Sequence, residues 1–201
     1  EYSGGRVTSE FCHSYTLAPS NIQSACPGGV DFSDAVGAGL DCPLAVAGCT
    51  GHGTQVAGAV GMLPRLFDVD GDLSSELFGG SATGVDLVAI RARLQGTDPS
   101  VCGAGISLCD FTTLSVILTA LDHLVDDYAG TPLAAVNMSF GFPAVKANTY
   151  ASCQANAGSS IGVGAYELMQ DSFGRLRSAG IAPVVAAGND GADPGDEDLI
   201  S

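Results

Sequence analysis

His52 is the residue of this chain whose type and setting most plainly suit chemistry. It lies between glycines in Gly51-His52-Gly53-Thr54, and the small and apolar residues from Gly53 to Met62 predict a helix that starts at the histidine. Imidazole titrates near neutral pH, so it can take a proton from a nucleophile and return it to a leaving group. A lone histidine is more often a buried, hydrogen-bonded residue without a chemical role, so the choice between that role and a general base depends on the other motifs of the chain.

Two other segments place polar or small residues at the end of an apolar run. Val136-Asn137-Met138-Ser139-Phe140-Gly141 closes a strand predicted over Leu133–Phe140, and Ala186-Ala187-Gly188-Asn189 closes one predicted over Ile181–Ala187. A further strand is predicted over Val85–Ala92. These strands must bring the polar residues into position.

Helices are predicted between the strands. Asp110 is the expected N-cap of a helix that runs to Tyr128, and a second helix is expected over Gly164–Ala179, with Gly180 ending it at C′. The residues expected to face inward are Leu114, Ile117, Leu118, Leu121, Leu124, Val125, Leu168, Met169, Phe173 and Leu176. Alternating strands and helices predict a parallel sheet with helical crossovers, whose functional groups lie at the carboxyl ends of its strands. The three special segments are therefore expected to converge.

Together these segments resemble the motifs of the subtilisin-like serine proteases. Gly51 to Gly58 is similar to the family's histidine motif, with Gln55 where a second histidine is common. The segment 136–141 resembles the substrate-binding strand, and 184–189 resembles the segment that ends in the oxyanion asparagine. The resemblance covers about Cys49 to Asn189. It implies an α/β fold, a three-layer sandwich around a parallel, doubly wound sheet, that is incomplete in this chain.

The resemblance also implies an activity and residue roles. A serine endopeptidase of this family hydrolyses peptide bonds with an Asp-His-Ser triad, in which His52 would be the general base. The amide of Asn189 would stabilise the oxyanion, the alternative being an ordinary turn asparagine. The residues implied to bind the polypeptide substrate are Ser139, Phe140, Gly141, Ala187 and Gly188. No cofactor is required for this chemistry.

The sequence contains no match for the other two triad residues. In this family the order is Asp, then His, then Ser. Asp31 and Asp34 precede His52, but neither follows an apolar strand or stands in Asp-Ser/Thr-Gly, and no serine stands in Gly-Thr-Ser. We expect both residues in the remaining part of the same protease domain, and we expect the 201 residues alone to be inactive. The alternative is a non-catalytic binding or structural protein derived from a subtilase.

Composition argues against several other classes of function. The formal net charge is −15, with seven Lys and Arg against 22 Asp and Glu, so nucleic acid and anionic membranes are not expected partners. No apolar run reaches 18 residues. Residues 1–5 do not resemble a signal peptide, and any export signal is expected outside the 201 residues. The glycines around His52 do not fit the Gly-x-Gly-x-x-Gly spacing of a nucleotide-binding domain.

The seven cysteines predict disulfides and hence a secreted, extracellular protein. The expected pairs are Cys12–Cys26, Cys42–Cys49 and Cys102–Cys109, which leaves Cys153 over. We expect a single, partial peptidase domain over residues 1–201. Within it, residues 1–50 form a disulfide-pinned, loop-rich region with one strand near Arg6–Phe11, and residues 51–201 form the α/β core.

Two metal sites compete with these interpretations. Cys42, Cys49 and His52 could ligate zinc, although the sequence offers no fourth ligand. Asp68, Asp70 and Asp72 alternate as in a calcium loop, but Leu73 and Gly79 stand where Gly and Glu are expected. A solvated acidic loop is the preferred interpretation of that segment, with calcium kept as a weak candidate. His123, among aspartates on a predicted helix, is expected at the surface.

Overall fold

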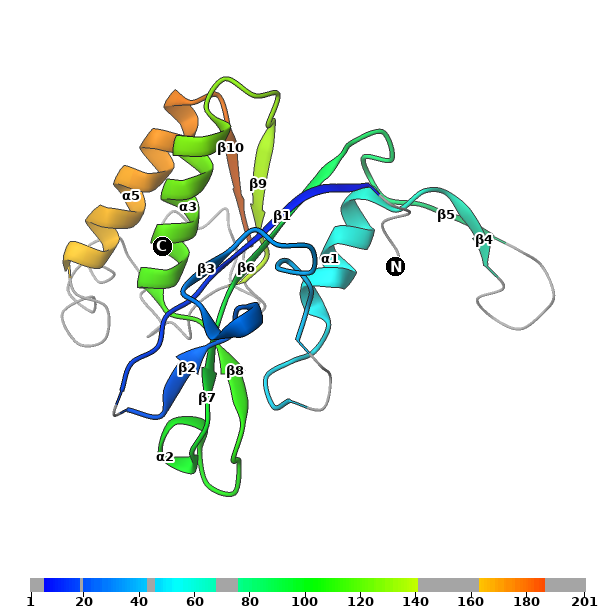
Figure 1. Ribbon diagram of the computed structural model, residues 1–201. Helices are drawn as coiled ribbons and strands as arrows, with labels where there is room; N and C mark the ends of the chain where they lie inside the picture. Colours follow the sequence, from blue (N-terminus) through cyan, green and yellow to red (C-terminus); the bar gives the residue numbers. More distant parts are fainter. Residues whose placement is uncertain (1–5, 19, 43–45, 68–75, 141–162, 187–201) are drawn as a thin grey trace, which may run out of the picture. The chain divides into compact units, whose positions relative to one another are not determined.

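A computed structural model describes residues 6–18, 20–42, 46–67, 76–140 and 163–186, without the side chains of Phe67 and residues 163–166 (Figure 1). The chain divides into two compact units, residues 1–117 and 118–201, and each is described by itself. The structure is mixed α/β with small sheets, two of which contain parallel strands. Across the described part of the chain, no helix has the length and apolar character that a membrane span needs.

The first unit is built around a parallel pair of strands. β1 (Val7–His13) pairs in parallel with β6 (Leu87–Ala92), and the short β3 (Phe32–Ser33) pairs antiparallel with β1. α1 (His52–Gly61) lies between β1 and β6 in sequence and so belongs to their crossover connection. These elements confirm the strands predicted near Arg6–Phe11 and over Val85–Ala92, and the helix predicted after Gly53.

Small side chains allow the end of α1 to lie close to β6. A Cβ atom on Gly61 would stand 3.2 Å from a methyl carbon of Leu87, so little space separates the two elements. The helix ends at Met62, whose N–H donates to the carbonyl of Gly58 at 3.0 Å. A hairpin of β4 (Arg65–Phe67) and β5 (Glu76–Phe78) follows.

The first unit also contains an antiparallel sheet that was not predicted from the sequence. β7 (Leu94–Gly96) lies between β2 (Ile22–Ser24) and β8 (Cys109–Phe111), and the four-residue helix α2 (Pro99–Cys102) connects β7 to β8. A single 3₁₀ turn, η1 (Pro27–Gly29), follows β2. The strands of this sheet have three residues each, too few to show a period-2 pattern.

Three disulfides hold the first unit together. They join Cys12 to Cys26, Cys42 to Cys49 and Cys102 to Cys109, which confirms the three predicted pairs. Two of them lie within the region 1–50 that was predicted to be pinned by disulfides. Cys153, the seventh cysteine, lies outside the described residues.

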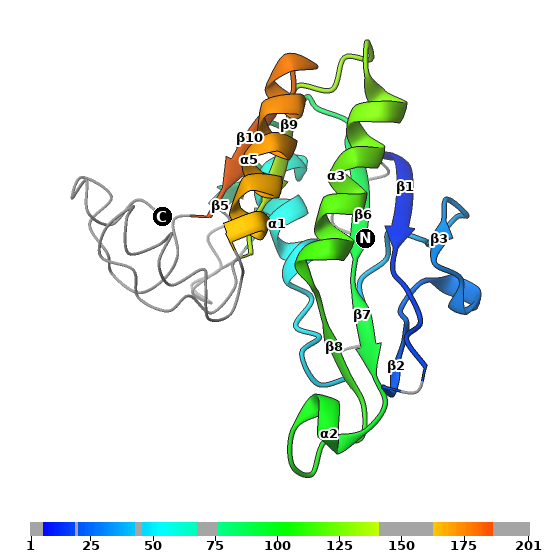
Figure 2. The same ribbon diagram turned by 90° about the vertical axis from the view of Figure 1, so that its left-hand side faces the viewer.

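The second unit combines a parallel strand pair with two helices. β9 (Ala135–Met138) pairs in parallel with β10 (Ala182–Val185), and α5 (Val163–Ser178) lies between them in sequence. Figures 1 and 2 show α5 beside α3 (Leu114–Tyr128), which begins in the first unit and continues into the second. Gly180 follows α5 with φ of 81°, and the N–H of Ile181 donates back to Leu176, as predicted for a helix that ends at Gly.

Two local predictions were wrong. Asp110 does not cap a helix, because it lies within β8, and α3 begins only at Leu114. Leu168 was expected to face inward but is 55 % exposed, whereas Leu176 on the same helix is fully buried. The buried stripe of α3 agrees better with its prediction, since Ile117, Leu121 and Leu124 are at most 4 % exposed.

Candidate functional site

His52 is the first residue of α1 and is exposed to solvent. Gly51 precedes it in the left-handed conformation, with φ of 69°, which favours glycine. The carbonyl of Gly51 accepts a hydrogen bond from the N–H of Gln55 at 3.1 Å, so the helical pattern starts at the histidine. The exposed ring excludes the alternative of a buried structural histidine and leaves the imidazole accessible to a reactant.

The segment before His52 is closed by the Cys42–Cys49 disulfide and attached to β8. The N–H of Asp110 donates to the carbonyl of Ala47 at 2.7 Å, and the guanidinium of Arg93 donates to the carbonyl of Gly48 at 3.1 Å. Gly48 has φ of 84° and lies directly against the backbone of Asp110. The loop is therefore attached to β8 at Ala47 and Gly48, the latter four residues before the histidine.

Asp110 and Arg93 form the ion pair beneath this loop. Arg93 Nε lies 3.1 Å from Asp110 Oδ2, and the Asp110 side chain is 1 % exposed. Its second oxygen, Oδ1, is buried and accepts no hydrogen bond from the described residues. Burial raises the pKa of the Asp110 carboxyl, and the charges of Arg93 and Arg91 oppose that effect. Sequence reasoning missed this pair, because its partners are 17 residues apart: Arg93 lies between β6 and β7, and Asp110 lies in β8.

The Cys42–Cys49 disulfide argues against the zinc site considered from the sequence. Zinc binds cysteine as the thiolate, and the sulfurs of Cys42 and Cys49 are bonded to each other instead. One carboxylate oxygen of Asp41 lies 3.6 Å from Cys42 Sγ and 3.9 Å from Cys49 Sγ. These three residues could gather around an ion only after the disulfide is reduced.

The second unit carries the residues expected to meet the substrate. In the parallel pair, Asn137 stands opposite Val184 and Met138 opposite Val185, and the N–H of Ala186 donates to the carbonyl of Met138 at 3.2 Å. The carboxyl ends of β9 and β10 therefore lie side by side, as their predicted roles require. Beyond β9, Ser139 is half-buried and accepts a hydrogen bond from the side-chain amide of Asn137 at 2.9 Å, while Phe140 is 42 % exposed.

Several predicted site residues lie outside the described part of the chain. They are Gly141, Ala187, Gly188 and Asn189 of the substrate and oxyanion segments, and Asp68, Asp70 and Asp72 of the acidic loop. Their roles stay predictions.

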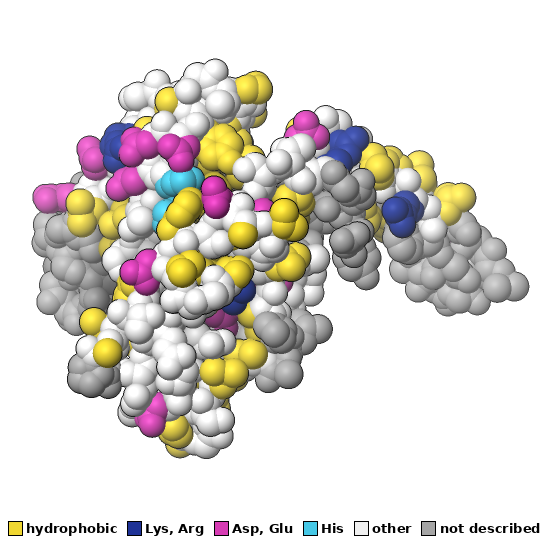
Figure 3. All heavy atoms as spheres, viewed as in Figure 1, with side chains coloured by type: hydrophobic (Ala, Val, Ile, Leu, Met, Phe, Trp, Pro, Cys, Tyr) yellow, Lys and Arg dark blue, Asp and Glu magenta, His cyan; other side chains and the backbone are white. Residues whose placement is uncertain are grey.

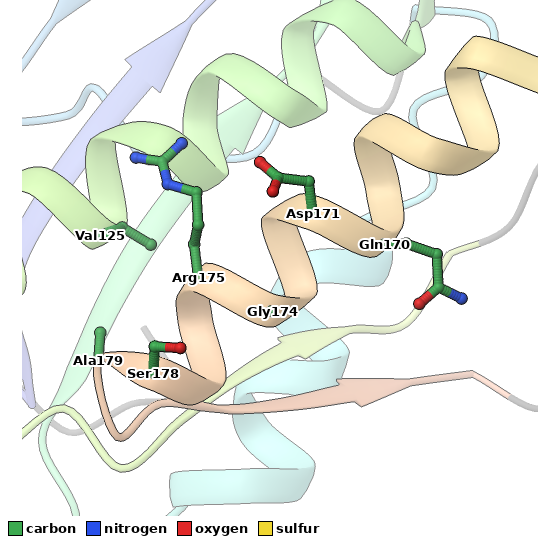
Figure 4. Close-up of a pocket in the computed structure, with 7 residues that line it drawn as sticks. All are labelled: Val125, Gln170, Asp171, Gly174, Arg175, Ser178 and Ala179. Carbon is green, nitrogen blue, oxygen red and sulfur yellow. The ribbon is translucent and has the colours of Figure 1, made fainter.

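A shallow groove in the second unit is a separate feature. It has a volume of about 590 Å³ and is lined by Val125 of α3, by the α5 residues Gln170, Asp171, Gly174, Arg175 and Ser178, and by Ala179, which follows α5 (Figure 4). The guanidinium of Arg175 pairs with Asp122 and, at 3.2 Å, with Asp126 of α3, so these ion pairs join the two helices.

His123 belongs to the same charged surface. Figure 3 shows acidic, basic and histidine side chains gathered over these helices. His123 Nε2 lies 3.1 Å from Asp127 Oδ2 one turn along α3, and the histidine side chain is 21 % exposed. This is the ordinary (i, i+4) pairing of a helix surface, in agreement with the prediction for His123.

Comparison of the chain with protein-family models, with curated proteins and with solved structures gave no match. The assignment of a function therefore depends on the motifs of the chain and on the geometry described above.

Proposed function

We propose that the protein is a serine endopeptidase of the subtilisin-like family and that His52 is its general base. The observation that carries the proposal is an exposed imidazole at the first residue of a helix that lies in the connection between two parallel strands. A general base has to be reachable by its nucleophile, which the exposed ring supports, and the helix start fixes the backbone that carries this ring.

In the proposed reaction, His52 removes the proton of a serine hydroxyl as that oxygen attacks the peptide carbonyl. It then returns the proton to the leaving amine. The serine and the aspartate that orients the imidazole come from polypeptide outside the 201 residues, because no motif for either occurs within them. The 201 residues alone are therefore inactive, since a triad reduced to one member retains only residual catalysis.

Substrate binding is assigned to the segments that follow β9 and β10. Ser139, Phe140 and Gly141 pair with the backbone of an extended peptide, and Ala187 and Gly188 form the facing wall of the specificity pocket. Asn189 donates its amide to the oxyanion, which typically contributes ~3–4 kcal/mol to transition-state stabilisation. The parallel pairing of β9 with β10 supports this assignment, because it brings the carboxyl ends of the two strands together.

The finer fold and the location of the protein are also proposals. The two parallel strand pairs and their helical crossovers support the three-layer sandwich of the family. Three disulfides support an extracellular protein. The reaction needs no cofactor, and calcium at the acidic loop 68–72 stays a weak candidate.

The coding sequence on both sides of the 201 residues tests the proposal at once. We expect an Asp-Ser/Thr-Gly motif upstream, at the end of an apolar strand, and a Gly-Thr-Ser motif downstream. An open reading frame that extends through both flanks without either motif would refute the protease and favour the non-catalytic binding protein.

A further inference from the structure

The first turn of α1 has no capping side chain of its own. Its N-cap is Gly51, and no acidic residue lies in the turn. The free amide groups of a helix N-terminus need acceptors, and the positive end of the helix dipole favours a nearby carboxylate. Most helices meet this need with Ser, Thr, Asp or Asn at the cap. In this protein the acceptor has to come from outside the helix.

The carboxylate of Asp41 lies at this place. Its Oδ2 is 3.8 Å from the position that a Cβ atom on Gly53 would take, and it accepts a hydrogen bond from Thr54 Oγ1 at 3.5 Å. Its Oδ1 accepts the N–H of Cys42 at 3.0 Å. One oxygen therefore faces the turn that begins with His52, and the other is held by the loop.

The backbone that carries Asp41 is fixed on both sides. The carbonyl of Leu40 accepts from the guanidinium of Arg91 in β6 at 3.4 Å. On the other side, Cys42 is joined to Cys49, and the loop between them is attached to β8 as described above. Asp41 therefore reaches α1 from a braced segment, so its contacts can define where the helix begins.

We infer that Asp41 is a positioning residue for His52. The catalytic meaning of this inference rests on the proposed function, whereas the structural part concerns only the first turn of α1. Asp41 acts through Gly53 and Thr54 and does not touch the reacting atoms. Misplacement of a catalytic group by about 1 Å can reduce a rate on the order of 10²-fold, so the start of this helix matters to a general base at its first residue.

The structural part is tested by NMR of the histidine Cε1–Hε1 groups in the full-length protein. His52 is assigned by a His52→Gln variant, and His13 and His123 serve as internal references. Asp41→Ala is expected to shift the His52 signal and leave the reference signals in place. Asp41→Asn keeps an oxygen that can accept from Cys42 and Thr54, so its shift is expected to be smaller. Asp34→Ala removes the same charge from an exposed site and is expected to change nothing.

Two results would overturn the inference. One is an unmoved His52 signal in Asp41→Ala, and the other is an equal shift in the Ala and Asn variants, which would reveal an effect of charge alone. If Asp41→Ala does not fold, Thr54→Val takes its place, because it removes the hydroxyl that donates to Asp41 and keeps the carboxylate charge; an unmoved His52 signal in that variant overturns the inference.

Peptide hydrolysis by the full-length protein tests the catalytic part. We expect kcat to fall about tenfold in Asp41→Ala with KM within about twofold of its native value, because the substrate-binding segments are untouched. Asp41→Asn is expected to recover most of the rate. A loss seen mainly in KM contradicts positioning of the base. If the native protein hydrolyses no peptide, the proposed function fails. The NMR comparison still decides whether Asp41 positions His52.

Discussion

Replacement of Gly48 by alanine tests how firmly the loop before His52 is seated on β8. Gly48 has φ of 84°, where an alanine costs about 1–2 kcal/mol, partly offset by the reduced entropy of the unfolded chain. In addition, the new Cβ would stand 2.3 Å from the carbonyl oxygen of Asp110, which belongs to the backbone of a paired strand. The loop must therefore move away from β8.

That movement has a predictable cost. It breaks the hydrogen bonds from the N–H of Asp110 to Ala47 and from Arg93 to Gly48, which contribute about 0.5–1.5 kcal/mol each. Gly48→Ala should therefore lower the free energy of unfolding by about 2–4 kcal/mol. Gly105→Ala is the matched control, because Gly105 is also exposed, has φ of 81°, and would place its Cβ in open space. The control should cost about 1 kcal/mol.

Urea unfolding followed by circular dichroism measures the difference, since the chain has no tryptophan for fluorescence. With an m-value of about 2 kcal/mol per M, the midpoint of Gly48→Ala should lie about 0.5–1.5 M below that of Gly105→Ala. Equal midpoints for the two variants would mean that the loop is not seated on β8, and the account of how His52 is held would be wrong.

Two further predictions concern burial. Burial raises the pKa of Asp110, so the folded protein disfavours the ionised carboxylate. The burial of this charge lowers the free energy of unfolding at neutral pH, and the loss is relieved as the pH falls towards the ordinary aspartate pKa of about 3.9. The side chain of the Asp110→Asn variant cannot ionise, so the free energy of unfolding of the native protein minus that of this variant should fall as the pH rises from about 3.5 to 7. Urea unfolding at both pH values measures this difference, and a rise in it would contradict the burial of the Asp110 charge. Leu176→Ala, at a fully buried site, should lower the free energy of unfolding by about 2–5 kcal/mol. Leu168→Ala, at a site 55 % exposed, should lower it by less than about 0.5 kcal/mol. Similar thermal unfolding midpoints for the two variants would contradict the described packing of α5.

Local patterns predicted the elements that carry the proposed site. The strands β6, β9 and β10 and the helices α1, α3 and α5 follow from apolar runs or helical periodicity within one segment, whereas residues 1–50, which contain β1, show no clean period. The disulfide pairs could be predicted because each joins cysteines at most 14 residues apart. The end of α5 could be predicted because Gly180 has a specific conformational role there.

Features that depend on distant partners could not be predicted. Asp110 has the sequence context of an N-cap, yet it is buried in β8 because Arg93 and Ala47 supply its partners. Asp41 shows no motif, and its contact with Thr54 across 13 residues appears only once the loop is closed. The antiparallel sheet of β2, β7 and β8 is built from strands too short to leave a period in the sequence.

Labelling of the full-length protein with a fluorophosphonate probe tests the central claim most directly. Such probes react with a serine that a neighbouring base has activated. We predict that the native protein and a His123→Ala control are labelled, and that His52→Ala is not. A native protein that resists the probe, or a His52→Ala variant labelled as fast as the control, would contradict the assignment of His52 as the general base of a serine protease.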